Sequence, residues 1–457
     1  MPFLGPSLPD IFFFFFCHSG RVISDLLRFL SLEYLINKIE GPTWPREERS
    51  VTLKSDRAQN LLLNTTLLIL FSLSPAIFAQ AHATSIGPPT VNAVLTGLNF
   101  PVSLKFAPDG RTFYNEKDTG NIRIIQPNGT LHPTPFATVN PVFNTGEAGL
   151  LGIALDPSFS SNNYVYVYYT YRDVGFFTHG HIVRYTATGN TGTSPKDIFD
   201  VTSSAPNTVY HNGGYIKFGP DGKLYAMVGE FHQGQQAQNQ SSMTGKMLRM
   251  NPDGSVPSDN PTAGSLDYAS GIRNSFGFDF DNSNNRLIAT MAGPSSDDKI
   301  LIIVKGGNYG WPTCLAVCND PRFIEATVDF KQIVTPTGIA AVAPNSYIFG
   351  EFNTGDLVQL QLNATGSVLS MTQLYNVPGG IIAVELGPNN KLYFTSPDTI
   401  YTYDLPARPA ANAADPSLVI LAVIVIIAAV LLLVYTALHY RRKRLQPLQQ
   451  VGTETPR

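Results

Sequence analysis

Short segments in which apolar and polar residues alternate, separated by tight turns, run through the middle of this chain. Residues 215–218 alternate and are β-prone, Pro220-Asp221-Gly222 follows, and residues 224–228 form the next apolar run. Proline presets φ, aspartate bonds back to the backbone, and glycine accepts a positive φ, so the tripeptide favours a turn. The pattern therefore predicts a strand, a tight turn and a second strand.

The same strand–turn–strand unit recurs at irregular intervals further along the chain. Close copies lie at residues 106–114, 218–225 and 386–393, and looser copies at 155–169 and 280–288. A β-sandwich with similar hairpins is the alternative, but the copies are too many and too far apart for one sandwich. Irregular repetition in an all-β chain is typical of propeller blades, and six blades of about 50 residues fit here. We predict an all-β fold, a six-bladed β-propeller, over residues 96–404.

An uninterrupted apolar segment, residues 418–438, lies near the C-terminal end and is followed by four basic residues at 441–444. As a helix this segment would rise about 30 Å, enough to cross the hydrocarbon core of a bilayer. The basic cluster marks the cytoplasmic side. A buried core helix is the alternative. We predict a linker at 405–416, a single transmembrane helix at 417–439 and a basic cytoplasmic tail at 440–457, with the propeller outside the cell membrane.

Export of the propeller requires an N-terminal signal, and residues 51–83 have the matching pattern. Basic residues precede an apolar run at 61–78, and small residues at 79–83 offer cleavage patterns. Residues 1–50 show no turn-and-strand pattern, and we interpret them as an extension from a misassigned start. The alternative is a retained helix near residues 62–80, which would give two membrane passes.

The charge and cysteine content bear on nucleic-acid binding, on disulfide formation and on zinc binding. Charged residues make up 14% of the chain and the net charge is −3, so no basic domain indicates nucleic-acid binding. Cys17, Cys314 and Cys318 are the three cysteines. Because the last two lie in a region predicted to be extracellular, we expect a disulfide between them, with two free thiols as the alternative. A zinc site would need further nearby ligands, which the sequence lacks.

Four motifs in the predicted propeller resemble the glucose/sorbosone dehydrogenase family. They lie at residues 146–152, 211–214, 271–274 and 293–312, and the last of these is the longest and most specific. The resemblance covers about residues 96–400. It implies a six-bladed propeller whose characterised members oxidise sugars with pyrroloquinoline quinone (PQQ) and calcium.

The resemblance also implies roles for individual side chains. His211 is expected to be the general base, taking the proton of a sugar hydroxyl while hydride passes to the quinone. An imidazole suits this role because it titrates near neutral pH. Arg273 is expected beside the quinone oxygens, where it would stabilise developing charge. Glu147 is expected to face the site, and Asn274 to support the loop.

Calcium and the remaining partners follow from the same resemblance. The backbone carbonyls of Gly293 and Pro294 are expected to hold the cofactor's calcium, a hard cation that prefers oxygen ligands. A sugar substrate and an external electron acceptor are the implied small-molecule partners. Each residue also has an ordinary structural interpretation: a loop histidine can stabilise a turn, a Gly-Pro pair can form one, and an arginine can join two blades.

The sequence departs from the family where the three carboxylates of PQQ would meet cations. Asn353, Gly380 and Ile382 stand where the family enzymes carry Lys, Arg and Arg. Phe276 replaces a Gln, and Lys299 replaces a carboxylate of a second calcium site. Two hypotheses result: a membrane-anchored, externally facing PQQ-dependent sugar dehydrogenase, or a non-catalytic surface propeller that binds carbohydrate or protein. The retained motifs favour the first, and the missing cations favour the second.

Overall fold

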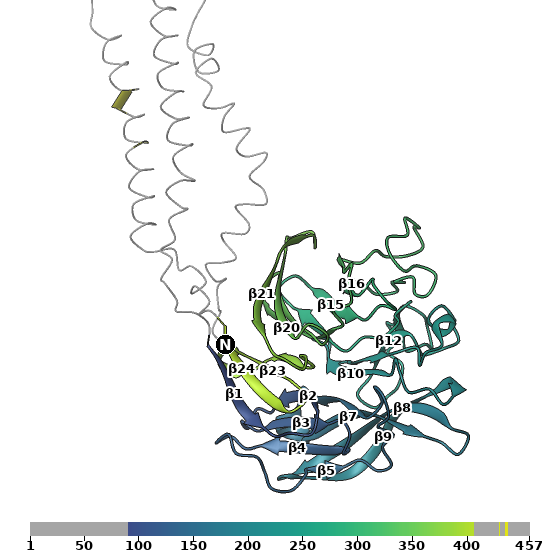
Figure 1. Ribbon diagram of the computed structural model, residues 1–457, viewed down its shortest axis with the longest axis vertical. Coiled ribbons are helices and arrows are strands. Elements are labelled where there is room, and N and C mark those ends of the chain that lie inside the picture. The colour runs from purple at the N-terminus through teal and green to yellow at the C-terminus, as the bar shows by residue number, and fades with distance from the viewer. Residues whose placement is uncertain (1–89, 406–428, 430–434, 437–457) are drawn as a thin grey trace, which may run out of the picture. The chain divides into compact units, whose positions relative to one another are not determined.

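The computed structural model describes residues 90–405, Ala429, Tyr435 and Thr436 (Figure 1). Among these residues, no helix is long and apolar enough to cross a membrane. The predicted extension, signal segment and cytoplasmic tail lie outside the described residues. So does the predicted membrane helix, apart from the three isolated positions, and all of the predicted linker after Leu405.

Six four-stranded antiparallel sheets make up residues 91–404. The first sheet contains β2 (Pro101–Phe106), β3 (Thr112–Glu116), β4 (Asn121–Ile125) and β5 (Ala137–Thr138). The second contains β6 (Leu150–Leu155), β7 (Tyr164–Arg172), β8 (Phe177–Thr188) and β9 (Thr191–Pro206). The third contains β10 (Gly213–Phe218), β11 (Leu224–Val228), β12 (Lys246–Met250) and β13 (Asp267–Ser270).

The remaining three sheets continue in chain order. The fourth contains β14 (Phe278–Asp281), β15 (Arg286–Met291), β16 (Lys299–Ile303) and β17 (Val328–Asp329). The fifth contains β18 (Pro336–Ala343), β19 (Ser346–Glu351), β20 (Asp356–Leu362) and β21 (Val368–Asn376). The sixth contains β22 (Val384–Leu386), β23 (Lys391–Thr395), β24 (Thr399–Asp404) and β1 (Val91–Thr96). Three short helices lie between strands: α5 (Phe159–Asn162), η1 (Gly234–Ala237) and η2 (Pro388–Asn390).

The hydrophobic core is divided among the contacts between neighbouring sheets. Six hydrophobic clusters each draw their buried side chains from two consecutive sheets, and one of them joins the sixth sheet to the first. The sheets therefore form a closed ring. This arrangement confirms the predicted six-bladed β-propeller.

The ring is closed by a strand from the N-terminal side of the domain. β1 pairs with β24, so that Val91 lies opposite Tyr403 and Thr96 opposite Thr399 (Figure 1). The sequence-based boundary at residue 96 leaves this strand out. All six residues of β1 are at least partly exposed, so no strongly apolar pattern marks it, and no turn motif precedes it.

The predicted turns join the first two strands of a sheet. Residues 107–111, 219–223 and 387–390 connect β2 to β3, β10 to β11 and β22 to β23. The looser copies at 155–169 and 280–288 lie at the equivalent places in the second and fourth sheets. The fifth sheet uses only Pro344 and Asn345 between β18 and β19, and Asn345 has a φ of 58°. This shortened turn explains why the repeat was not recognised there.

Charged side chains from four innermost strands meet at the end of the central channel near these turns. Nζ of Lys105 on β2 lies 2.6 Å from Glu385 on β22 and donates to the hydroxyl of Tyr215 at 2.9 Å. Lys217 on β10 pairs with both Glu385 and Asp279 on β14. Burial alone would raise the pKa of Glu385, but the charges of Lys105 and Lys217 lower it to about 2. Two cations and two anions thus neutralise one another in this cluster.

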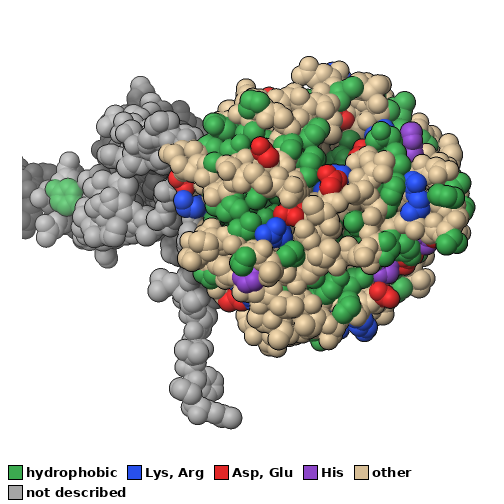
Figure 2. Space-filling model, turned by 60° about the horizontal axis from the view of Figure 1, so that its bottom comes forward, with side chains coloured by type: hydrophobic (Ala, Val, Ile, Leu, Met, Phe, Trp, Pro, Cys, Tyr) green, Lys and Arg blue, Asp and Glu red, His purple; other side chains and the backbone are tan. Residues whose placement is uncertain are grey.

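The outer surface shows no dominant charge on the face in Figure 2. Basic and acidic side chains are scattered among hydrophobic and uncharged ones over the described part of this face. Nucleic-acid binding requires a basic patch or stripe. The view therefore gives no support for such a partner.

Candidate active site

The backbone bends sharply at His211, just before β10. His211 has a φ of 59°, and the glycines at 213 and 214 follow with φ values of 64° and 99°. A Cβ on Gly213 would lie 2.6 Å from the carbonyl oxygen of Met227, so only glycine permits this approach. The bend places His211 at the N-terminal end of β10, the opposite end of that strand from the charged cluster.

The ring of His211 pairs with a carboxylate from the neighbouring strand. Its Nδ1 atom lies 2.6 Å from Oε1 of Glu230, which follows β11. Both side chains are almost fully buried, with exposed fractions of 8% and 1%. A carboxylate at Nδ1 favours the tautomer that carries its proton there. Nε2 makes no hydrogen bond to any residue in the described part of the chain, so its lone pair is available in this tautomer.

Glu147 connects the loops of three sheets. Its Oε2 atom accepts hydrogen bonds from the backbone amide of His211 at 2.7 Å and from Nδ2 of Asn274 at 2.8 Å. The Oδ1 atom of Asn274 in turn accepts from the backbone amide of Gly213 at 3.1 Å. Three of the residues proposed from sequence therefore lie in one hydrogen-bonded group.

Arg273 lies beside this group. Its guanidinium stands 5.3 Å from the ring centroid of Trp311 and donates to the carbonyl of Ala292 at 3.1 Å. Its Nε atom is buried without a partner. Burial lowers the pKa of Arg273, and the nearby carboxylates, chiefly Glu230, offset part of that shift. The guanidinium is thus held between the Trp311 ring and the Ala292 carbonyl, with its Nε donor unpaired.

The carboxylate of Asp298 holds the loop at Gly293. Asp298 accepts hydrogen bonds from the backbone amides of Gly293, Val334 and Thr335 at 2.7, 2.8 and 2.7 Å. No described residue donates to the carbonyl oxygens of Gly293 or Pro294. Within the described part of the chain there is no group of three or more His, Cys, Asp or Glu that could hold a metal. A cation at this loop would therefore depend on the two free carbonyls.

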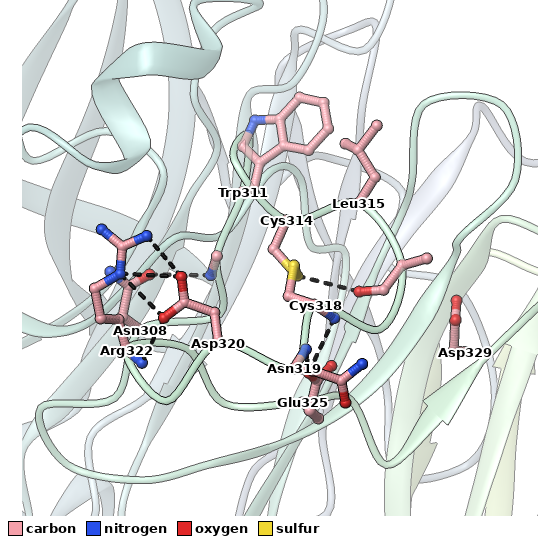
Figure 3. Close-up of a disulfide and its surroundings, with 12 residues drawn as sticks. Asn308, Trp311, Cys314, Leu315, Cys318, Asn319, Asp320, Arg322, Glu325 and Asp329 are labelled. Carbon is pink, nitrogen blue, oxygen red and sulfur yellow. Dashed lines mark hydrogen bonds and ion pairs between the residues drawn. A yellow bond between two sulfur atoms is a disulfide. The ribbon is translucent and has the colours of Figure 1, made fainter.

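A disulfide joins Cys314 to Cys318, with their Cα atoms 5.7 Å apart (Figure 3). The structure therefore agrees with the expected pairing. Glu325 accepts hydrogen bonds from the amides of Cys318 and Asn319, each at 3.0 Å. The bridge closes the loop directly after Trp311 and so lies near the ring that Arg273 faces.

A pocket of about 370 Å³ opens at the His211 end of the propeller. Five aromatic residues line it: Phe100, Tyr210, Tyr215, Phe276 and Phe352. His211 does not line the pocket itself, but its neighbours Tyr210 and Gly213 do. Lys117 and Glu147 are the only charged residues lining it in the described chain.

Of the three positions where the family enzymes carry cations, one lines this pocket and the other two adjoin Phe352, which lines it. Ile382 lines it, and so does Phe352, the neighbour of Asn353. Gly380 packs directly behind Phe352, because a Cβ on Gly380 would lie 2.5 Å from the Phe352 carbonyl oxygen. Lys299 lies elsewhere, buried and donating to the carbonyl of Leu315 at 2.5 Å.

Comparison with known proteins identifies this architecture. Residues 98–400 match the sequence profile of glucose/sorbosone dehydrogenases. The chain belongs to this family. Its members found by sequence include a quinoprotein glucose dehydrogenase B from Acinetobacter calcoaceticus, 32% identical over 303 residues, and an aldose sugar dehydrogenase from Escherichia coli, 31% identical over 256 residues.

These matches cover part of each relative. The Acinetobacter match spans 59% of this chain and 62% of the relative, and the E. coli match spans 54% and 66%. Among solved structures, the PQQ-bound aldose sugar dehydrogenase of Streptomyces coelicolor is 30% identical, with a TM-score of 0.62. That likeness covers 70% of this chain and 99% of the other.

The residues of the pocket do not complement PQQ. A ligand with three carboxylates loses its hydration on binding and needs cations in exchange. The charged residues lining the pocket, Lys117 and Glu147, sum to zero. Nζ of Lys117 already contacts Asp118 at 2.5 Å and the carbonyls of Gly146 and Ala148 at 3.2 Å. Arg273 does not line the pocket, so the carboxylates would have no free cation among the described lining residues.

Two of these residues were missed by the sequence analysis. Glu230 is the second residue after the apolar strand Leu224–Val228, and a charged residue at such a strand end is a usable signal. Lys117 follows a strand of mixed polarity, Thr112–Glu116, and no local feature distinguishes it. Both belong to the site only because separate sheets bring them there.

Proposed function

We propose that this protein is a sugar oxidoreductase that removes a proton and a hydride from a sugar hydroxyl group. The observation that carries the proposal is the buried pair of His211 and Glu230, next to the pocket residues Tyr210 and Gly213. Membership of a family with sugar-oxidising relatives supports the same reaction class. The substrate is proposed to be an aldose, as in the names of the E. coli and Streptomyces relatives.

His211 is proposed to act as the general base. With its proton on Nδ1, the ring presents the lone pair of Nε2 to a substrate hydroxyl. Glu230 would hold the ring in this orientation and stabilise the imidazolium once the proton is taken. Glu147 would fix the position of the His211 backbone through the 2.7 Å hydrogen bond. The hydride would pass to a small oxidant in the pocket near Arg273.

Calcium binding is proposed at the carbonyls of Gly293 and Pro294. Both oxygens lack hydrogen-bond donors among the described residues, and carbonyl oxygen suits this cation. Water and a bound ligand would have to supply the other ligands. A calcium-dependent rise in the thermal unfolding temperature, absent with magnesium, tests this site.

An external, membrane-anchored location is also proposed. It is supported by the apolar segment 418–438 with its basic flank and by the disulfide, because such bonds persist outside the cytosol. Digestion of the propeller by protease added to intact cells would test it. Protection of the propeller from that protease would reject this orientation.

The decisive experiment measures aldose oxidation by the purified full-length protein with an added quinone acceptor and calcium. His211→Ala should reduce turnover by roughly 10²- to 10⁴-fold, the usual contribution of a general base. The matched control is His179→Ala, which removes a histidine paired with a carboxylate on the second sheet and should leave turnover unchanged. Equal turnover of the parent and His211→Ala would exclude this base. No oxidation of any aldose by the parent would reject the proposed reaction and leave binding of a carbohydrate or a protein as the function.

A further inference from the structure

The pocket offers little compensation for negative charge. Lys117 is the only cation lining it in the described chain, and Asp118 and two carbonyls already occupy its ammonium group. Glu147 adds a negative charge. One anionic group on a ligand could share Lys117, but a second and a third would be buried without a partner.

The walls instead favour a flat, apolar ring. The five aromatic residues of the pocket can stack on such a ring or meet it edge-on, and Val102, Leu151 and Ile382 add aliphatic surface. A pocket of about 370 Å³ is within the usual range for small-molecule sites.

The backbone conformation at Gly380 excludes an arginine at that position. Gly380 has a φ of 93°, and any side chain there would collide with the carbonyl of Phe352. An arginine at this position would therefore require the loop to move. At this one position the backbone conformation itself, and not only the residue type, excludes a cation.

We propose that this pocket binds a quinone that carries at most one negative charge, and that PQQ is a poor ligand. The proposal rests on the proposed sugar oxidation and names its electron acceptor. The sugar C–H bond breaks and its hydride passes to the quinone, while the hydroxyl proton passes to Nε2 of His211. His211 then returns that proton to the reduced ring. The products are a carbonyl compound and a hydroquinone, so two electrons and two protons are transferred.

The test compares two quinones by isothermal titration calorimetry on the purified full-length protein in detergent. The probes are 1,4-naphthoquinone-2-sulfonate, which has one negative charge, and PQQ with calcium. We expect the naphthoquinone to bind at least about ten-fold more tightly, which is less than the effect of two missing charge-assisted contacts. Equal or tighter binding of PQQ, or no binding of either quinone, would overturn the proposal.

Variants that add a cation to the apolar wall should change the preference. Ile382→Arg and Phe352→Lys should each raise the affinity for PQQ relative to the naphthoquinone by roughly 10- to 100-fold, the effect of one charge-assisted contact. Phe352 is 37% exposed, so the second variant should fold even if the first does not. The matched control is Leu369→Arg, an equal charge change on β21 at a side chain that is 68% exposed. It should leave the ratio of affinities unchanged.

Binding and turnover separate this proposal from the proposed reaction. A preference for the naphthoquinone without aldose oxidation would support the pocket assignment and reject the reaction. Aldose oxidation with a preference for PQQ would support the reaction and reject the pocket assignment.

Discussion

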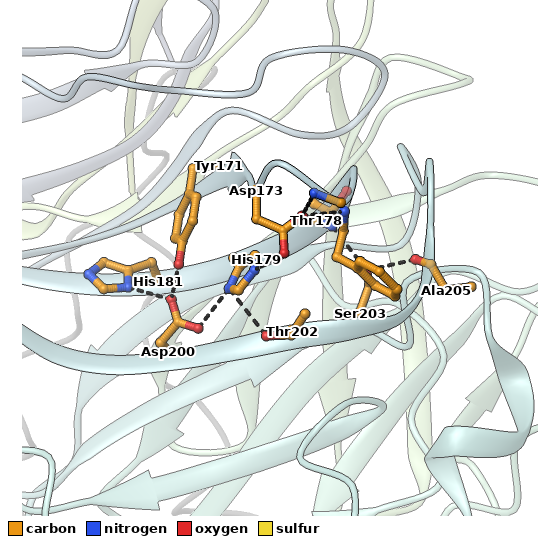
Figure 4. A network of polar contacts seen from close by, with 11 residues as sticks. Tyr171, Asp173, Thr178, His179, His181, Asp200, Thr202, Ser203 and Ala205 are labelled. Atoms are coloured by element: carbon orange, nitrogen blue, oxygen red, sulfur yellow. Dashed lines mark hydrogen bonds and ion pairs between the residues drawn. The ribbon is translucent and has the colours of Figure 1, made fainter.

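Histidine and carboxylate side chains pair in two regions of this molecule, and the two pairings differ in what they leave unbonded. On the outer strands of the second sheet, Asp200 on β9 lies between two histidines of β8 (Figure 4). Its carboxylate oxygens lie 2.8 Å from Nδ1 of His179 and 2.7 Å from Nδ1 of His181, and it accepts a hydrogen bond from Tyr171 at 2.8 Å. Nε2 of His181 lies 3.1 Å from Asp197. This outer network satisfies both oxygens of its central carboxylate.

The His211–Glu230 pair beside the pocket leaves polar atoms without hydrogen-bond partners. Oε2 of Glu230 is buried without a hydrogen-bond partner, and Nε2 of His211 contacts no polar atom of a described residue. His211 also has a positive φ, a conformation that non-glycine residues seldom adopt and that is common at functional sites. The residue types are the same in both regions. The candidate active site is therefore distinguished by polar atoms without hydrogen-bond partners and by a positive φ at the histidine. The histidine–carboxylate pairing itself does not distinguish it.

Replacing the carboxylate in each pair is the strongest test of this distinction. Glu230→Gln should lower aldose turnover roughly 10- to 100-fold, part of the general-base contribution of about 10²- to 10⁴-fold. The amide can no longer stabilise the imidazolium of His211. Turnover and its pH profile should be measured together for the parent and the variant. The matched change Asp200→Asn should leave both quantities unaltered, and an equal loss in the two variants would remove the distinction.

The disulfide offers a second test, because it closes a loop on the pocket side only. Cys314→Ser combined with Cys318→Ser should lower the free energy of unfolding by about 2 kcal/mol, the value expected for a loop this short. Denaturant unfolding of the oxidised parent, the reduced parent and the variant would measure it. The variant and the reduced parent should agree. Mass mapping without reductant should give one linked peptide that contains Trp311, and recovery of both cysteines as free thiols would contradict the bridge.

The outer network should affect stability rather than chemistry, and by a smaller amount. Burial alone would raise the pKa of Asp200, but hydrogen bonds from His181, His179 and Tyr171 lower it to about 2. Asp200→Asn should cost about 1 kcal/mol near pH 5, a modest value because the carboxylate is partly exposed to solvent.

The pH dependence of that cost has a definite sign. The contribution of Asp200 is present above the ordinary aspartate pKa of 3.8 and is lost as the pH falls towards about 2. For His181, burial alone would lower the pKa, but hydrogen bonds to Asp200 and Asp197 raise it. Its contribution is therefore present below 6.5 and is lost as the pH rises through the folded-state pKa. Thermal unfolding of parent and variant should differ most between about pH 4 and 6, and a pH-independent difference would contradict this account.

The sequence was sufficient for the architecture because propeller blades are local. Each turn that joins β2 to β3 or β10 to β11 lies between strands that are adjacent in the chain, and Pro, Asp and Gly determine its shape. The fifth blade was not recognised from the sequence because its turn, Pro344 and Asn345, is too short to contain the Pro-Asp-Gly motif. β1 was not recognised because its pairing partner, β24, lies at the other end of the domain sequence.

The candidate site was predicted less completely, for the same reason. His211, Arg273 and Glu147 were found through motifs, and the structure brings them together. Glu230 and Lys117 carry no motif, and their relation to the pocket depends on contacts between different sheets. At Ile382, the sequence showed only that the arginine of the family enzymes is absent. It did not show that the pocket is apolar there. The backbone constraint at Gly380 required coordinates.

The pairing of β1 with β24 has a consequence for how the protein is made. Residues 97–398 are already synthesised before the partner of β1 begins to leave the ribosome. Until then the sixth sheet lacks β24, the strand that joins β1 to β23, and β1 has no strand to pair with. Exposed apolar faces and unpaired strand edges promote aggregation, so nascent chains of this protein should require protection late in synthesis. A truncation before Thr399 removes β24 with everything that follows it, and it should therefore leave β1 unpaired at the edge of the ring.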